Sequence, residues 1–168
     1  MKKQGFTLIE LMVVIVIMGI LAAVAVPKLF GMIAKSKASE VGPAAGTYVK
    51  LQQAYFSESS MAGGWQLIGY MAPGDNSKTT NFSYHPGVIA VGASAALDAS
   101  GKIGWKAGNF QNLNECQGGG ANNPTYHWTV TLKSAAATTN GNADVAFTAA
   151  ADAAGCVALT PTFDKIGK

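Results

Sequence analysis

The chain has 168 residues, and its 12 lysines and 9 acidic residues leave a formal net charge of only +3. This near balance offers no basic surface for a phosphate backbone, which argues against nucleic acid as a partner. The length allows one modest globular domain, and an apolar N-terminal segment takes part of it. We therefore expect one domain plus one membrane segment.

The apolar segment runs from Phe6 to Val26, and only Thr7 and Glu10 within its 21 residues are polar. As a helix it would span roughly 31 Å, which matches the hydrocarbon core of a bilayer. A carboxylate at that depth costs about 2.5–3.5 kcal/mol on insertion scales, so Glu10 is predicted to have a functional partner. In the alternative interpretation, Glu10 reaches the headgroup layer near the helix end and needs no partner.

An ordinary secretory signal peptide is a competing interpretation of the same segment. Lys2 and Lys3 form a basic start, the apolar run follows, and residues 23–25 offer a small-x-small cleavage site. The mature protein would then be a soluble exported binding protein. Glu10 inside the apolar region and a helical pattern that continues past Val26 both argue against this interpretation.

Beyond Pro27 the pattern becomes amphipathic, with apolar residues at helical intervals among charged ones up to residue 60. One face of this helix can lie on a sheet while the other meets solvent. Gly42-Pro43 is expected to bend the helix, because proline disfavours a helical conformation at the residue before it. The helix should end between residues 57 and 64, where "SESSMAGG" supplies helix breakers.

Residues 61–168 predict a small antiparallel sheet. The clearest strand is "YHWTVTLK" at 126–133, where apolar and polar residues alternate with a period of two and His127 falls on the solvent face. Further strand candidates lie at residues 81–92, 102–106, 143–149 and 155–160. Packed on the second half of the long helix, these strands would give an α+β fold.

Two cysteines, Cys116 and Cys156, lie in the last third of the chain. An even number of cysteines beyond a membrane segment predicts one disulfide formed in an oxidising compartment. The alternative is a pair of unpaired buried thiols. The two histidines, His85 and His127, have no neighbours at spacings suited to a metal site or a nucleophile–base pair, so we expect no enzyme, no metal and no cofactor.

The string "KKQGFTLIELMVVIVIMGILAAVAVP" resembles the N-terminal signature of type IV pilins and of the pseudopilins of type II secretion systems. It combines a short basic leader, Gly, an aromatic residue, Thr-Leu-x-Glu and a long apolar run. The resemblance implies a pilin-like fold, in which a long N-terminal helix packs its second half on a small antiparallel sheet. The implied segments are a leader at 1–5, a transmembrane and polymerisation helix at 6–27, an amphipathic helix at 28–60 and a head at 61–168 with a disulfide-closed loop.

The resemblance also implies how the N-terminus is processed and used. A membrane-bound prepilin peptidase would cut between Gly5 and Phe6 and methylate the new amine of Phe6. Phe6, Thr7 and Glu10 would then serve in assembly, with the Glu10 carboxylate pairing with the terminal amine of a neighbouring subunit. Such a pair in an apolar bundle sets the register more than it adds net stability.

The leading hypothesis is a structural subunit of a type IV pilus. Its implied partners are copies of itself, the prepilin peptidase, an inner-membrane assembly platform, and membrane lipid before assembly. The precursor would sit in the inner membrane with its N-terminus cytoplasmic and its head exported, and the assembled subunit would lie in an extracellular pilus. The helix between Gly19 and Pro27 could lose helical structure in that filament.

A major pseudopilin of a periplasmic pseudopilus is the alternative within the same family. The cysteine pair favours a pilin, and the sparse acids near the C-terminus offer little for the calcium site expected of a major pseudopilin. The pilus subunit is therefore the preferred hypothesis.

Overall fold

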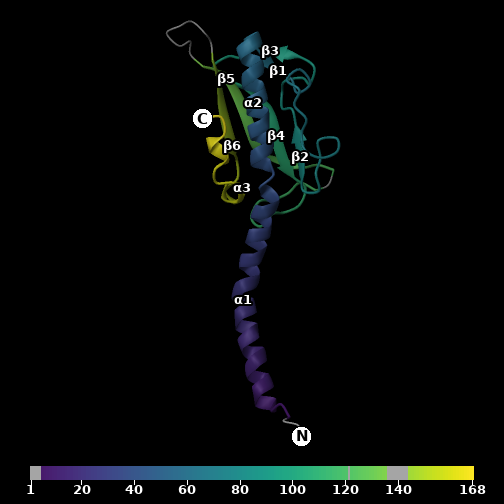
Figure 1. Cartoon of the computed structure of the whole chain (residues 1–168), viewed down its shortest axis with the longest axis vertical. Helices are drawn as coiled ribbons and strands as arrows, with labels where there is room; N and C mark the ends of the chain where they lie inside the picture. The colour runs from purple at the N-terminus through teal and green to yellow at the C-terminus, as the bar shows by residue number, and fades with distance from the viewer. Residues whose placement is uncertain (1–4, 121, 136–143) are drawn as a thin grey trace.

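A computed structural model describes residues 5–120, 122–135 and 144–168. Two helices, α1 (Leu8–Ala38) and α2 (Val41–Ser59), follow one another with a two-residue turn between them. The first part of α1 forms a stem that projects far from the head (Figure 1). Pro27 lies inside α1 without ending it.

The two ends of α2 show one error and one success of the sequence prediction. The helical path is interrupted at Ser39 and Glu40, and not at Gly42-Pro43 as expected. Pro43 lies instead in the first turn of α2, where a missing backbone N–H is tolerated. At the other end, Ser60 takes a left-handed conformation and donates its N–H to the Phe56 carbonyl, so the helix ends within the predicted range.

The head is built on a four-stranded antiparallel sheet in the order β2-β4-β5-β6. Helix α2 lies across one face of this sheet, and the C-terminal segment lies beside β6 (Figure 1). This arrangement confirms the predicted α+β fold. The strands are β2 (Phe82–His85), β4 (Lys102–Asn109), β5 (Thr125–Ser134) and β6 (Val145–Ala151); β1 (Ala62–Gly63) pairs with β3 (Ser94–Ala95), and α3 (Ala154–Leu159) and the short helix η1 (Phe163–Lys165) end the chain.

Most of the strand predictions are confirmed. The segment 126–133 lies within β5, and 102–106 lies within β4. Of the segment 143–149, residues 145–149 lie in β6, Asp144 precedes the strand, and residue 143 is outside the described residues. Only Phe82–His85 of the segment 81–92 is a strand. The prediction for 155–160 is wrong, because this segment belongs mostly to α3, and its buried Cys156 and Leu159 are three residues apart, as on one face of a helix.

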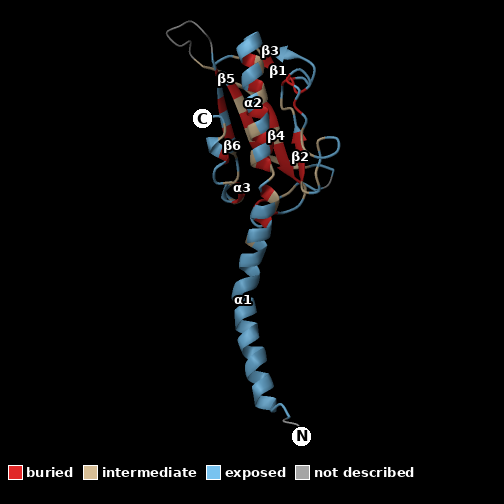
Figure 2. Cartoon of the chain, in the orientation of Figure 1, coloured by how far each residue is buried: buried red, intermediate tan, exposed pale blue. Residues whose placement is uncertain are grey.

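The core of the head lies between α2 and the sheet (Figure 2). The largest fully buried side chains include Tyr48 from α2, Trp105 from β4 and Trp128 from β5. The Gln52 side chain is also fully buried. In the amide orientation that satisfies both groups, its oxygen accepts a hydrogen bond from the Gly63 N–H at 2.8 Å and its nitrogen donates one to the Gly63 carbonyl at 3.0 Å. The head therefore holds its own hydrophobic core, whereas every described residue of α1 up to Phe30 is exposed.

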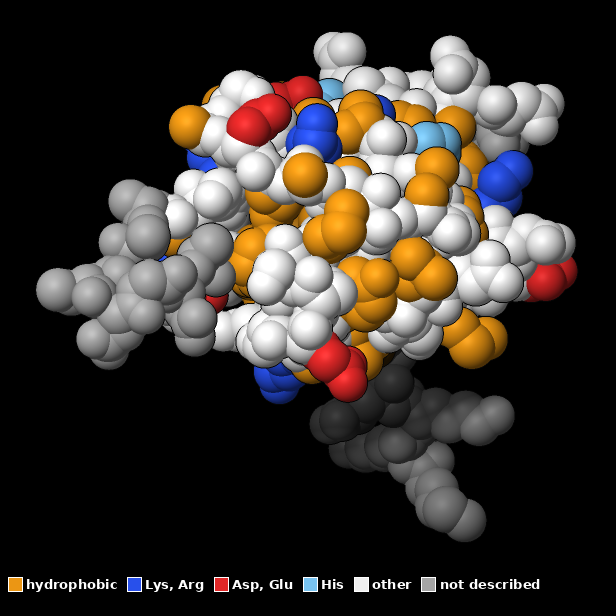
Figure 3. Space-filling view, turned by 90° about the horizontal axis from the view of Figure 1, so that it is seen from above, with side chains coloured by type: hydrophobic (Ala, Val, Ile, Leu, Met, Phe, Trp, Pro, Cys, Tyr) orange, Lys and Arg blue, Asp and Glu red, His pale blue; other side chains and the backbone are white. Residues whose placement is uncertain are grey.

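The outer end of the head, opposite the stem, carries hydrophobic side chains interspersed with uncharged polar ones and few charges (Figure 3). The large apolar residues exposed on the head are Leu67, Met71, Val88, Val91 and Val157. A surface this poor in charge is consistent with the low charged fraction of the whole sequence, which is 12%.

Candidate functional site: the N-terminal stem

The stem presents an apolar surface that no other described part of the chain covers. Its large side chains from Phe6 to Ile33 are all exposed, and Phe6 itself is 83% exposed. The most apolar 18-residue window of the helix has a mean hydropathy of 2.9, and none of that window is buried. A contiguous apolar surface of this size marks a membrane or protein contact. By length and composition, this one helix among the described residues could cross a membrane.

A capping box stands at the start of the stem. The Thr7 hydroxyl accepts a hydrogen bond from the Glu10 N–H at 3.4 Å, while the Thr7 N–H donates to Glu10 Oε2 at 2.9 Å. The Thr7 hydroxyl also donates to the same Oε2 at 2.6 Å. These reciprocal bonds satisfy backbone donors that the first turn of a helix leaves unpaired. Thr7 is thus the intrachain partner of Glu10, and it fixes the residue at which α1 begins.

The capping box adds a partner that the sequence interpretation missed. The signal was present in the sequence, because Thr followed three residues later by Glu is a known N-terminal helix pattern. Both bonds from Thr7 end on Oε2, and among the described residues no hydrogen bond ends on Oε1. Glu10 is therefore held in a fixed position with one carboxylate oxygen available to a second partner.

The predicted processing site precedes the helix. Gly5, Phe6 and Thr7 have no regular secondary structure and are exposed, so the peptide bond between Gly5 and Phe6 lies on an accessible, non-helical segment. This geometry is compatible with the predicted cleavage, which stays a prediction.

Gly19 and Pro27 both lie within the continuous helix α1. A Cβ added at Gly19 would meet nothing within 4 Å, so packing in the single chain does not require glycine at this position. The predicted loss of helix between Gly19 and Pro27 concerns the filament and stays a prediction.

Glu40 connects the turn between α1 and α2 to the rest of the head. Its Oε1 accepts hydrogen bonds from the Thr79 hydroxyl at 2.6 Å and from the Tyr84 hydroxyl at 3.1 Å. Burial raises the pKa of the Tyr84 hydroxyl, and the negative charge of Glu40 raises that pKa further. Tyr84 therefore stays a hydrogen-bond donor at physiological pH, and the base of the stem is tied to β2.

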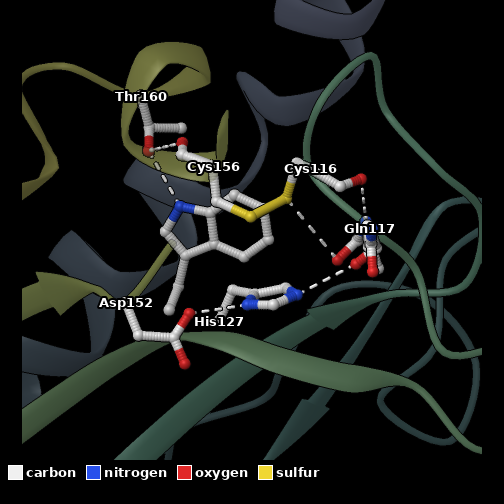
Figure 4. A network of polar contacts seen from close by, with 8 residues as sticks. Cys116, Gln117, His127, Asp152, Cys156 and Thr160 are labelled. Atoms are coloured by element: carbon white, nitrogen blue, oxygen red, sulfur yellow. Dashed lines mark hydrogen bonds and ion pairs between the residues drawn. A yellow bond between two sulfur atoms is a disulfide. The ribbon is translucent and has the colours of Figure 1, made fainter. Parts of the chain in front are cut away.

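The Cys116–Cys156 disulfide is formed, as predicted, and both residues are fully buried. Beside it, His127 lies between Asp152 and Gln117 (Figure 4). Its Nδ1 is 2.6 Å from Asp152 Oδ1, and its Nε2 is 2.9 Å from the Gln117 carbonyl oxygen. The prediction that His127 faces solvent is wrong, since it is only 9% exposed. Its ring holds together the two segments that the disulfide joins.

Cys116, His127 and Cys156 also bring three potential ligand atoms within 4.8 Å of one another. A cysteine binds a metal ion as its thiolate, however, and in this structure the two sulfur atoms are bonded to each other. We therefore interpret this cluster as a structural link between the β4–β5 connection and α3.

The fold and the stem define a class: a head of one helix on an antiparallel sheet, carried by an exposed apolar helix that begins at a Thr-Leu-x-Glu motif. Residues 1–26 match the family model described as the prokaryotic N-terminal methylation motif. No solved structure matches the chain.

Relatives of known name agree with this class. The chain is 34% identical over 133 residues to the fimbrial protein EcpC of Eikenella corrodens. This alignment covers 75% of this chain and 80% of that protein. It is 46% identical over 57 residues to the type IV major pilin protein PilA of Myxococcus xanthus, covering 34% and 26% of the two chains. A fimbrial protein of Pseudomonas aeruginosa is 36% identical over 103 residues, covering 61% and 58%. The chain belongs to the type IV pilin family.

Proposed function

We propose that this chain is a structural subunit of a type IV pilus. It is made as a membrane precursor, cleaved between Gly5 and Phe6, methylated on the new amine, and polymerised through α1. The precursor spans the inner membrane with its N-terminus cytoplasmic and its head exported, and it meets a prepilin peptidase and an assembly platform there. The assembled subunit lies in an extracellular filament and has no enzymatic role.

The single observation that carries the proposal is the held carboxylate of Glu10 on an otherwise apolar, exposed helix. Before cleavage the nitrogen of Phe6 is a neutral amide, whereas after cleavage it is an ammonium at the end of the helix. When subunits bundle their stems away from water, an unpaired ammonium or carboxylate is strongly unfavourable, and a matched pair is tolerated. The free Oε1 of Glu10 suits the incoming Phe6 ammonium of a neighbouring subunit.

Two other functions have less support. The relatives reported above are fimbrial proteins, and nothing in the described part of the chain favours a secretion pseudopilin over a pilin. An ordinary signal peptidase would have to cut near Ala25, but α1 passes through that position without a break. The structure thus offers no non-helical segment for such a cut within residues 8–38.

The test separates the charge of Glu10 from its capping role. Glu10→Gln keeps an oxygen that can accept from the Thr7 N–H but removes the charge, whereas Glu10→Ala removes both. We expect both variants to insert in the membrane and to be cleaved after Gly5, because the scissile bond is unchanged. Both should fail to form filaments, since an incoming Phe6 ammonium would be buried without a partner.

The readouts are the intact mass of the membrane-extracted subunit and the yield of sheared filaments. A methylated chain beginning at Phe6 shows that processing took place, and Glu58→Gln, an exposed change at the end of α2, is the matched control that should assemble normally. Normal filaments from Glu10→Gln would show that Glu10 serves only to cap the helix. A mature chain beginning at Val26 would overturn the whole proposal.

A further inference from the structure

A cavity of about 430 Å³ lies where the stem meets the head. It is open to solvent on one side and is lined by the last turn of α1, the first turn of α2 and the C-terminal segment, and its volume falls in the range of small-molecule sites. Its lining combines basic, hydroxyl and apolar side chains, among them Lys35, Ser39, Thr160, Thr162, Leu159 and Phe163. Of the described residues that line it, none is acidic.

The position of the cavity relative to a membrane follows from the length of the stem. Large exposed apolar side chains are found from Leu8 to Ile33, with Glu10 and Lys28 as the charged residues among them, and Ala34 is the first buried residue of α1. These 26 residues span roughly 39 Å as a helix, about 9 Å more than the hydrocarbon core. If lipid covers this apolar surface, the base of the head is drawn to the membrane, and Lys35, two residues beyond Ile33, lies in the headgroup layer.

Lys35 has a charge that no described residue neutralises. Within the part of the chain that the structure describes, it forms no ion pair with an acid. The Thr162 hydroxyl can donate a hydrogen bond to an anion beside it, whereas the hydroxyls of Ser39 and Thr160 already donate to the backbone carbonyls of Ser36 and Cys156. A basic group, a hydroxyl donor and an apolar floor together match a phosphate attached to a glycerol and acyl chains.

We propose that, in the unassembled subunit, this cavity holds the headgroup of an anionic phospholipid from the leaflet on the exported side. The inference rests on the proposed function, because it requires that α1 span the membrane before assembly. The bound lipid holds the base of the head against the membrane surface. It leaves when the subunit is taken from the membrane into a filament.

The test uses the full chain in nanodiscs that contain equal amounts of phosphatidylglycerol and phosphatidylcholine. Native mass spectrometry then counts the lipids of each class that stay bound to the released protein. We expect phosphatidylglycerol to be retained about fivefold more than phosphatidylcholine, the factor that one basic residue contributes at an anionic surface. Lys35→Gln should abolish this preference.

A second variant tests the cavity itself. A Cβ at Gly42 would meet nothing within 4 Å, so Gly42→Leu should fold and fill the cavity while leaving Lys35 in place. It should also abolish the preference. Gly46→Leu, on the same helix but outside the cavity lining, is the matched control for the added side chain. Lys28→Gln, two turns before Lys35 on the stem, is the control for general electrostatic attraction to anionic lipid. Both variants should keep the preference for phosphatidylglycerol.

Several results would overturn the inference. Equal retention of the two lipids, or a preference lost with Lys28→Gln but kept with Gly42→Leu, would mean that no headgroup binds in the cavity. Binding of soluble glycerol 3-phosphate to the detergent-solubilised chain as tightly as phosphatidylglycerol would identify a soluble anion as the ligand. A retained second copy that Gly42→Leu removes would identify a subunit contact. Filament yield is measured separately, so the proposed function and this inference can each fail alone.

Discussion

Reduction of the Cys116–Cys156 disulfide should lower the free energy of unfolding by an amount that the loop length sets. The bond closes 40 residues, and the chain-entropy model gives roughly 4 kcal/mol at 25 °C for a loop of that length. Reduction keeps both sulfur atoms, so it removes the cross-link without opening a cavity in the buried site. For a chain of this size the melting temperature should fall by about 8–16 °C.

The assay is thermal unfolding of the full chain in detergent, compared between the oxidised protein and protein reduced in denaturant and refolded under reductant. Alkylation and intact mass establish the state of the thiols in each sample. The double variant Cys116→Ala/Cys156→Ala is the control, because its melting temperature should not respond to reductant. A fully reduced wild-type protein that melts within about 2 °C of the oxidised one would refute the reasoning, as would two readily alkylated thiols in the native protein.

Three further changes probe the head. In Gly104→Ala the new Cβ would lie 2.0 Å from the buried Tyr48 hydroxyl, so the free energy of unfolding should fall by about 1–3 kcal/mol. Gly46→Ala, with open space around it on α2, should raise the free energy of unfolding by about 0.5–1 kcal/mol. The urea midpoints of the two variants should therefore move in opposite directions. Glu40→Ala leaves the buried Tyr84 hydroxyl without its acceptor and should lower the free energy of unfolding by about 1–3 kcal/mol in the same urea measurement. Glu40→Gln keeps an acceptor oxygen, so an equal loss of stability in this variant would argue against the explanation.

The parts of the fold that the sequence predicted are those with a long, regular pattern. The stem is a long and mainly apolar run, and β5 alternates between buried and partly buried residues from Trp128 to Leu132. The segment 155–160 has only six residues, which is too short for its period to distinguish a strand from a helix. The interruption at residues 39–40 was misplaced because the sequence marks it with no breaker, whereas Gly42-Pro43 looks like one and is accepted within the first turn of α2.

The same distinction holds for the polar contacts. The partners in the Thr7–Glu10 capping box are three residues apart, so the local sequence contains the whole arrangement. By contrast, 25 residues separate His127 from Asp152, and 44 separate Glu40 from Tyr84. Such pairs form only when strand register and helix position are fixed. His127 was assigned to solvent because alternation along a strand gives its face, but not the loop that covers that face.

The stem and the head are stabilised in different ways, so substitutions in the two parts have different effects. The head buries its own core and closes it with a disulfide, so changes at residues such as Gly104 or Cys116 act on its unfolding equilibrium. The stem buries almost nothing by itself, and its apolar surface is stabilised only when lipid or neighbouring stems cover it. In the proposed function, a change at Glu10 therefore alters which of these two environments the stem can enter, while the head remains folded in both.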